Sequence, residues 1–331
     1  ILSLVLESGA RLAERGEFTK RAFLNGRLDL TQAEAVIDLI KAKSDKSFDV
    51  ALEQLEGALS AKIKDIRALL VDVLVNLTVN IDYPDEDIEE MTYEKLFKDV
   101  SNIRDYIDNL LKTADTGKIL NEGLKVSIVG KPNVGKSSLM NALIGENRAI
   151  VTDIPGTTRD TIEETISVRG IPVVITDTAG IHETDDLIEQ IGISKSKESF
   201  NNADLIIFVI DSSQELSLED FDIMKHIGER NTIVLLNKTD KGQVVLRKQI
   251  ENEIKNVFII ESAVSKGIGI KELADRIEDL VYAGKVNQQN SVMVTNVRHE
   301  RILKEAFTAA GDALQMIEMK QPLEFIEIDV N

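Results

Sequence analysis

Residues 130–137 have the sequence Gly-Lys-Pro-Asn-Val-Gly-Lys-Ser, which fits the phosphate-binding pattern GxxxxGKS. An apolar strand pattern over 125–129 precedes the loop and a helical pattern over 138–143 follows it, as this motif requires. Backbone N–H groups of such a loop and the helix N-terminus attract phosphate oxygens. We expect Lys136 to reach the terminal phosphates and Ser137 to offer its hydroxyl to Mg²⁺. The predicted phosphate contacts lie at Asn133, Val134, Gly135, Lys136, Ser137 and Ser138.

Two later segments bear on which base is bound. The apolar run 233–236 leads into Asn237-Lys238-Thr239-Asp240, and the strand pattern 257–260 leads into Glu261-Ser262-Ala263. A carboxylate at Asp240 would accept hydrogen bonds from N1–H and the exocyclic amine of guanine, whereas adenine lacks this pair of donors. The second segment resembles the last guanine-binding element of translation-factor GTPases. The sequence therefore predicts a guanine site with contacts from Asn237, Lys238, Asp240, Ser262 and Ala263.

A fourth motif, Asp177-Thr178-Ala179-Gly180, lies between these elements and follows the strand pattern 173–176. We expect its Asp to hold Mg²⁺ through water and the backbone of its Gly to sense the γ-phosphate. Four motifs in this order predict an enzyme that binds GTP and hydrolyses it to GDP.

Composition narrows the class of protein. The chain has 331 residues, a net charge of −18, no cysteine and three scattered histidines. These values argue against disulfides, against a zinc site and against tight nucleic-acid binding through phosphates. No apolar run is long enough to cross a bilayer and no signal peptide is recognised, so we expect a soluble, cytoplasmic protein with no membrane contact.

Helical patterns flank the motifs. A capping box at Thr31-Gln32-Ala33-Glu34 and apolar spacings of three and four predict helix over 31–80, ended by Pro84. A second helix is predicted at 92–113. Gly117 and Gly123 are expected to bracket a linker into the first strand. The predicted apolar face contains Leu52, Leu55, Leu59, Ile63, Ile66, Leu70, Val73 and Leu77.

From 124 to about 284, strand and helix patterns alternate, and after 290 the helical pattern returns at Leu303, Phe307, Ala310, Leu314 and Ile317. The strands are expected at 125–129, 164–168, 172–177, 204–210, 232–237 and 257–261. The two helical regions need each other to bury their apolar stripes. The predicted fold is therefore an α/β P-loop GTPase domain with a doubly wound sheet (121–284), inserted into an all-α helical domain (1–120 and 285–331).

Several segments together resemble the MnmE (TrmE) family of tRNA-modification GTPases. They are the segment from Gly16 to Ala35, Asp82-Tyr83-Pro84, Gly156-Thr157-Thr158-Arg159-Asp160 and Asn296-Val297-Arg298-His299. The resemblance covers essentially the whole chain. It implies a dimer whose GTPase domains meet when GTP and K⁺ are bound. It also implies that the protein acts together with an MnmG-like flavoprotein to modify the wobble uridine of tRNA. The tRNA would be contacted through the complex of the two proteins.

The resemblance also sets limits. We expect this chain to lack the family's N-terminal folate-binding domain and its Cys-containing C-terminal tail, with the last helical part truncated. We expect a tetrahydrofolate derivative to bind only in the full-length protein, and this chain alone should not modify tRNA. Arg27 is a candidate remnant of the folate contact; an exposed charge with no such role is the equal alternative.

The remaining site assignments follow from the resemblance. Ile181 stands where Ras-like enzymes have a Gln that orients water, and the family places this role at the position of Glu189; the alternative is an exposed carboxylate like Glu183, Asp185 and Asp186. K⁺ would be bound by Asn133, Thr152, Ile154 and Thr157, and Mg²⁺ by Ser137 and Thr158; two adjacent threonines alone do not decide between the ions. The nucleotide-contacting segments are predicted to include Thr152, Asp153, Ile154, Pro155, Gly156, Thr157 and Thr158, and Asp177, Thr178, Ala179 and Gly180.

Two other functions are compatible with parts of the sequence. A regulatory GTPase switch could recruit an RNA-processing or ribosome-assembly partner, but relatives of that kind carry RNA-binding domains instead of the segment 16–35. A P-loop ATPase would not need the motif at 237–240.

Overall fold

The computed structural model describes residues 1–83, 92–146, 164–176, 203–255, 257–282 and 292–331. These residues divide into two compact units. The first, which we call the helical unit, comprises Ile1–Ala42, Phe48–Lys118 and Asn290–Asn331. The second, which we call the sheet unit, comprises Lys43–Ser47 and Ile119–Gln289.

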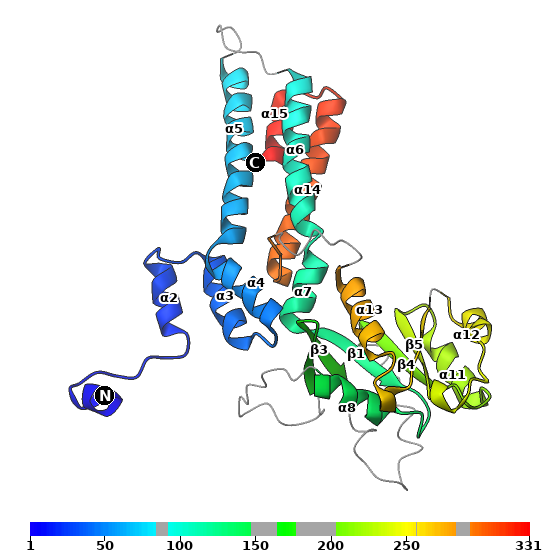
Figure 1. The fold of residues 1–331 in the computed structure, drawn as a ribbon. Coiled ribbons are helices and arrows are strands. Elements are labelled where there is room, and N and C mark those ends of the chain that lie inside the picture. The colour runs from blue at the N-terminus through cyan, green and yellow to red at the C-terminus, as the bar shows by residue number, and fades with distance from the viewer. Residues whose placement is uncertain (84–91, 147–163, 177–202, 256, 283–291) are drawn as a thin grey trace. The chain divides into compact units, whose positions relative to one another are not determined.

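Helices account for the regular structure of the described residues before and after the sheet (Figure 1). Three long helices carry the core: α5 (Ala58–Asp82), α6 (Tyr93–Leu111) and α14 (Val297–Glu318). The shorter ones are α1 (Leu2–Glu7), α2 (Glu17–Leu24), α3 (Leu30–Lys41), α4 (Asp45–Leu55), α7 (Ala114–Glu122) and α15 (Leu323–Val330). No helix in the described ranges is long and apolar enough to cross a membrane.

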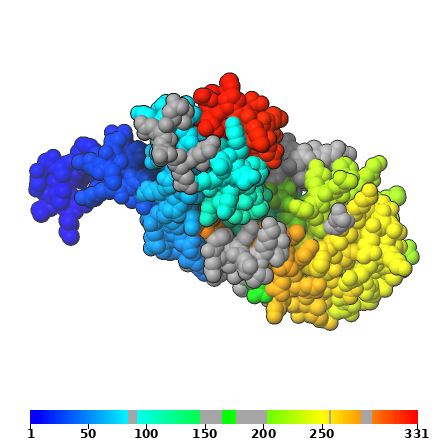
Figure 2. Space-filling model, turned by 90° about the horizontal axis from the view of Figure 1, so that it is seen from above, coloured from blue at the N-terminus to red at the C-terminus, as the bar shows by residue number. Residues whose placement is uncertain are grey.

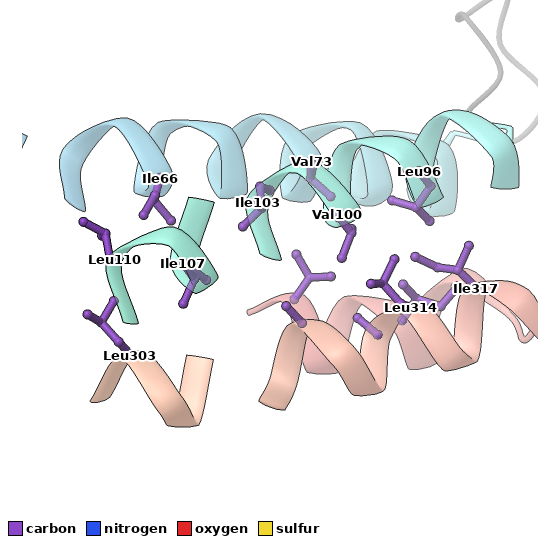
Figure 3. Close-up of a cluster of buried hydrophobic side chains, with 14 of the residues drawn as sticks. Ile66, Val73, Leu96, Val100, Ile103, Ile107, Leu110, Leu303, Leu314 and Ile317 are labelled. Carbon is purple, nitrogen blue, oxygen red and sulfur yellow. The ribbon is translucent and has the colours of Figure 1, made fainter. Parts of the chain in front are cut away.

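The core of the helical unit forms where α5, α6 and α14 turn their apolar faces toward one another (Figure 3). Val73 of α5, Ile103 of α6 and Leu314 of α14 are all buried in it. The short last helix α15 packs on α5 and α14. In the space-filling view, the red atoms of the C-terminal segment lie beside cyan atoms of the helical unit (Figure 2). The apolar stripe predicted after residue 290 is confirmed, because Leu303, Ala310, Leu314 and Ile317 are buried and Phe307 packs against them.

The predicted continuous helix over 31–80 is wrong. The chain forms three helices there, α3, α4 and α5, and Gly57 between the last two has a φ of 92°, in the left-handed region. A glycine adopts this conformation without steric cost, so it ends one helix and starts another in a new direction. Ile63, predicted to be buried, is 39% exposed, although Leu59 and Ile66 of the same helix are buried.

The predicted capping box also lies elsewhere. Asp29 is the N-cap of α3: its carboxylate accepts from the N–H of Gln32 at 2.9 Å, and the Gln32 side chain accepts from the N–H of Asp29 at 3.0 Å. Thr31 is inside the helix. Glu34 instead binds Arg298 and His299 at the start of α14.

The predicted linker between Gly117 and Gly123 is a helix, α7. Gly117 lies inside it, where a Cβ would be 2.3 Å from the carbonyl oxygen of Val294. The N–H of Val294 donates to the hydroxyl of Thr113 at 3.1 Å, at the start of the same helix. Gly117 therefore marks a close approach between two backbones that are far apart in sequence, rather than a flexible joint.

The described residues of the sheet unit form a six-stranded sheet in the order β2-β3-β1-β4-β5-β6. All neighbouring pairs are parallel except β2 and β3, so the sheet is mixed. The strands are β1 (Leu124–Val129), β2 (Glu164–Val168), β3 (Ile171–Thr176), β4 (Leu205–Asp211), β5 (Thr232–Asn237) and β6 (Phe258–Glu261). The six predicted strands are thus confirmed to within a residue at each end.

Helices of the sheet unit cover both faces of its central strands. Phe208 and Ile210 of β4 pack with α11 (Leu218–Ile227) and α12 (Arg247–Glu253), while every residue of β4 is buried. Helices α8 (Lys136–Glu146) and α13 (Ile270–Tyr282) contact strand β2 and each other. Such burial on both faces is typical of parallel sheets, whose ligands bind at the carboxyl ends of the strands.

Candidate nucleotide-binding site

The phosphate-binding motif forms the turn between β1 and α8. Three of its residues have positive φ: Gly130 at 147°, Asn133 at 62° and Gly135 at 111°. A backbone of this kind turns successive N–H groups toward one concave surface, where anions bind. The helix that follows adds the partial positive charge of its N-terminus.

The two glycines of the loop have no room for a side chain. A Cβ on Gly130 would lie 2.3 Å from the carbonyl oxygen of Val209 in β4. A Cβ on Gly135 would lie 2.3 Å from Nδ2 of Asn237, at the end of β5. The loop therefore packs closely against the carboxyl ends of two strands. Both the lack of space for a Cβ and the positive φ explain why these two positions are glycine.

Lys136 and Ser137 occupy the first turn of α8, which begins two residues before the helix predicted at 138–143. The ammonium group of Lys136 donates to the carbonyl oxygens of Gly130 at 2.7 Å and of Lys131 at 2.6 Å. This position keeps a positive charge at the mouth of the loop. The hydroxyl of Ser137, the residue after Lys136, is a hard oxygen ligand of the type that Mg²⁺ prefers.

Asn237 connects the loop to the base-recognition motifs. Its side chain is buried, with Nδ2 donating to the carbonyl oxygen of Val134 at 2.8 Å and Oδ1 accepting from the N–H of Val264 at 3.1 Å. A single side chain thereby joins three of the predicted motifs, at the ends of β1, β5 and β6.

Lys238 follows in the left-handed conformation, with a φ of 64°. Its ammonium group donates to the carbonyl oxygen of Asn133 and to Oδ2 of Asp211, both at 2.7 Å. Burial raises the pKa of Asp211, but the hydrogen bonds from Lys238 and Ser213 outweigh that effect and hold the pKa below its usual range. The carboxylate therefore stays charged and fixes the lysine beside the loop.

The two segments predicted to bind guanine, 237–240 and 261–263, lie beside each other. Thr239 donates from its N–H and its hydroxyl to the carbonyl oxygen of Ser262, at 3.1 and 3.0 Å. The carboxylate of Asp240 forms an ion pair with Lys266 at 3.2 Å. Ser262 and Ala263 are fully buried. The structure therefore brings together the predicted residues Asn133, Val134, Gly135, Lys136, Asn237, Lys238, Asp240, Ser262 and Ala263.

The other predicted site residues lie outside the described residues. These are Thr152, Asp153, Ile154, Pro155, Gly156, Thr157, Thr158, Asp177, Thr178, Ala179, Gly180 and Glu189. Arg27 is described; it is exposed and follows α2 in the helical unit. Among the described residues, no group of three or more His, Cys, Asp and Glu side chains could hold a metal ion.

Asp211 is a site residue that the sequence analysis did not identify. It is the last residue of β4, whose preceding residues are all apolar. An acidic residue that ends a buried parallel strand lies where ligands bind in such sheets, so its position was the available signal.

Comparison with known proteins identifies the family. A model described as the MnmE helical domain matches residues 30–331, and one described as the GTP-binding protein TrmE N-terminus matches residues 1–27. The chain is 53% identical over 330 residues to a tRNA modification GTPase MnmE of Clostridioides difficile (strain 630). It is 46% identical over 331 residues to that of Bacillus subtilis (strain 168). Each match covers 100% of this chain and 72% of the relative.

Solved structures that are similar to parts of this chain include the following two. The G domain of the T. maritima FeoB iron transporter is 26% identical, with a TM-score of 0.33, over 47% of this chain and 97% of that one. A variant of Aquifex aeolicus Era bound to GDP and AlF4⁻ is 27% identical, with a TM-score of 0.35, over 56% of this chain and 66% of that one. Scores this low support no structural argument, so the assignment depends on the sequence matches. Those matches span the whole chain, and the chain belongs to the MnmE family of tRNA modification GTPases.

Proposed function

We propose that this chain hydrolyses GTP with K⁺ and Mg²⁺ as cofactors. We further propose that the resulting conformational change drives carboxymethylaminomethyl-type modification at C5 of the tRNA wobble uridine, together with an MnmG-like flavoprotein. The observation that carries the GTP assignment is the direct linkage of the phosphate loop to the guanine motif. Asn237 and Lys238 reach the carbonyl oxygens of Val134 and Asn133 across the carboxyl edge of the sheet.

Different residues would bind the phosphates and the base of GTP. Lys136 and the loop N–H groups neutralise the β- and γ-phosphates, where the transition state spreads its charge. Ser137 is the described residue that would hold Mg²⁺, which would supply positive charge to stabilise the phosphates. Asp240 would accept from guanine in place of its present partner Lys266. A carboxylate can only accept hydrogen bonds. Adenine lacks the adjacent pair of donors that guanine presents, so it would leave the carboxylate of Asp240 unsatisfied.

Base selectivity can be tested at Asp240. An Asp240→Asn variant should bind GTP at least about a hundredfold more weakly, because its amide cannot accept both guanine donors. The same variant should bind xanthosine triphosphate better than the unaltered protein does, since xanthine has a carbonyl where guanine has its amine. Equal GTP affinity in the variant and the unaltered protein would remove Asp240 from the base site.

The proposed K⁺ site centres on Asn133, whose positive φ places it at the outward turn of the loop. K⁺ would supply, near the γ-phosphate, the positive charge that an arginine supplies in other GTPases. GTP turnover should be strongly faster in KCl than in NaCl of equal concentration. Asn133→Gly removes the side chain while keeping the backbone conformation, so it should abolish this difference without a strain penalty, whereas Asn133→Ala adds strain.

Glu189 is the proposed residue that orients the attacking water. Glu189→Ala should lose turnover and keep GTP binding, since the role is confined to the chemical step.

Equal rates of GTP turnover in KCl and NaCl would exclude the potassium mechanism. That result would favour a slow regulatory switch that recruits an RNA-processing or ribosome-assembly partner.

The proposed assembly follows the same assignments. We place the GTPase unit as an insertion between the two parts of the helical domain, and we propose that two GTPase units pair when GTP and K⁺ are bound. Light scattering with GDP and aluminium fluoride should show a dimer in KCl and a monomer in NaCl.

The remaining proposed contacts involve ions and folate. Thr157 would join the K⁺ site and Thr158 the Mg²⁺ site. Arg27 would contribute to folate binding only in the full-length protein.

A further inference from the structure

Residues on both sides of the connection between β4 and α11 contact the phosphate loop or a side chain that binds it. At the start, the carbonyl oxygen of Val209 lies so close to Gly130 that no Cβ would fit, and Asp211 holds Lys238, which binds the carbonyl oxygen of Asn133. At the end, Asp220 in the first turn of α11 forms an ion pair with Lys131, the second residue of the loop, at 2.7 Å.

The ion pair at the end of the connection is almost completely buried. The side chain of Asp220 is 1% exposed and that of Lys131 is 18% exposed. Oδ2 of Asp220 also accepts from the N–H and the hydroxyl of Ser217, the N-cap of α11, both at 2.9 Å. The ammonium group of Lys131 donates to the same hydroxyl at 3.0 Å. Three groups thus converge on one carboxylate oxygen, while Oδ1 has no hydrogen-bond partner among the described residues.

Lys131 connects this cluster to the phosphate-binding lysine. Its side chain binds α11, and its backbone carbonyl oxygen accepts from Nζ of Lys136 at 2.6 Å. A shift of the Lys131 backbone would therefore move an acceptor of Lys136 and change the curvature of the loop. Helix α11 itself is held by buried Met224 and Ile227 against the sheet, so it offers a rigid support.

We infer that Asp220 and Lys131 are positioning residues for the phosphate loop, through which α11 holds the loop in its phosphate-binding conformation. Neither side chain needs to touch the nucleotide. A loop that is already shaped for phosphate loses less conformational entropy on binding and releases nucleotide more slowly. The effect should be equal for GDP and GTP, because both place a β-phosphate in the loop.

The test is the dissociation rate of mant-GDP from the purified chain. Lys131→Met removes the ammonium group and keeps most of the stem, so dissociation should be about tenfold faster, as expected for one charge-assisted hydrogen bond. The association rate should be unchanged, because most effects on affinity within one site appear in dissociation. Lys131→Arg keeps the charge and its donors, and it should restore slow dissociation. A Lys131→Met variant that releases mant-GDP at the unaltered rate would overturn the inference.

A double variant separates positioning from a folding defect. Lys131→Met alone leaves the buried Asp220 without its counter-ion, which could disturb α11. Lys131→Met with Asp220→Asn removes both charges, so that penalty disappears while the link to the loop stays broken. Fast release in the double variant supports the positioning role. Recovery of slow release would show that the unpaired charge was the cause and would overturn it.

A matched control lies in the same unit. Asp275→Asn breaks the exposed ion pair between Asp275 and Arg169, which joins α13 to the turn between β2 and β3, so mant-GDP release should be unchanged. The experiment needs no K⁺, tRNA or partner protein. Its failure is therefore distinct from a failure of the proposed function.

Discussion

Asn237 at the end of β5 donates a hydrogen bond to the carbonyl oxygen of Val134, a residue of the phosphate loop, at 2.8 Å. The two residues are far apart in sequence, and they meet because β1 and β5 end at the same edge of the sheet. The bond makes Asn237 a structural support of the phosphate loop, in addition to its proposed role in the guanine motif.

Replacement of Asn237 should therefore weaken more than base recognition. Asn237→Ala removes the hydrogen bonds to Val134 and Val264 and leaves their buried backbone groups unpaired, which should lower the free energy of unfolding by about 2–3 kcal/mol. GDP affinity should fall as well. Thermal unfolding with and without GDP measures both effects, and an unchanged melting temperature without nucleotide would contradict the supporting role.

The pair of Asp211 and Lys238 predicts a pH effect on the sheet unit. The pKa of Asp211 is lower in the folded protein than its usual value, so its contribution to stability is fully present above about pH 4 and is lost as the pH falls through the folded value. Asp211→Asn should lower stability by about 1–3 kcal/mol at pH 7 and by less in acid. Denaturant unfolding at pH 7 and at about pH 3, below the usual Asp value, measures the difference. Equal losses at both pH values would contradict the pKa assignment.

His299 predicts a pH effect of its own in the helical unit. Burial and the Arg298 guanidinium lower its pKa, and they outweigh the carboxylates of Glu34 and Asp38, which raise it. The folded protein therefore favours neutral imidazole. Stability from this group is fully present above about pH 6.5 and declines below it, as the unfolded chain takes up a proton more readily.

His299→Gln removes the titrating group and retains a polar side chain of similar reach. The fall in melting temperature between about pH 7 and about pH 5 should be smaller in this variant than in the unaltered protein. His226→Gln is the control, since that histidine is exposed on α11 and its ring bonds a carbonyl oxygen of its own helix. A fall of the same size in both variants would exclude His299 as the source.

Two helical glycines should respond oppositely to alanine. In Gly117→Ala the new Cβ would meet the carbonyl oxygen of Val294 at 2.3 Å, so stability should fall by about 1–3 kcal/mol. In Gly311→Ala the nearest atom is Nε of Arg104 at 3.6 Å, an ordinary contact, and stability should rise by up to about 1 kcal/mol. Melting temperatures of the two variants should move in opposite directions. A stable Gly117→Ala protein would show that the 292–295 segment can move away from α7.

The strands of the sheet were predictable because their signals are local. The run 232–237 was predicted with the bounds that β5 has, and the motifs at 130–137 and 237–240 name their own chemistry. The helical region was predicted less well. Its apolar spacing continues through Gly57, so periodicity alone did not show that the chain turns there.

The sequence by itself determined the family, the strands and the phosphate and guanine motifs, because each of these depends on residue types at short, fixed spacings. Tertiary structure alone decided which polar residues meet across long separations. Asp220 binds Lys131, Glu34 binds Arg298, and Gly117 is required by Val294. These relationships depend on chain direction and strand order in three dimensions, and no local pattern in the sequence records them.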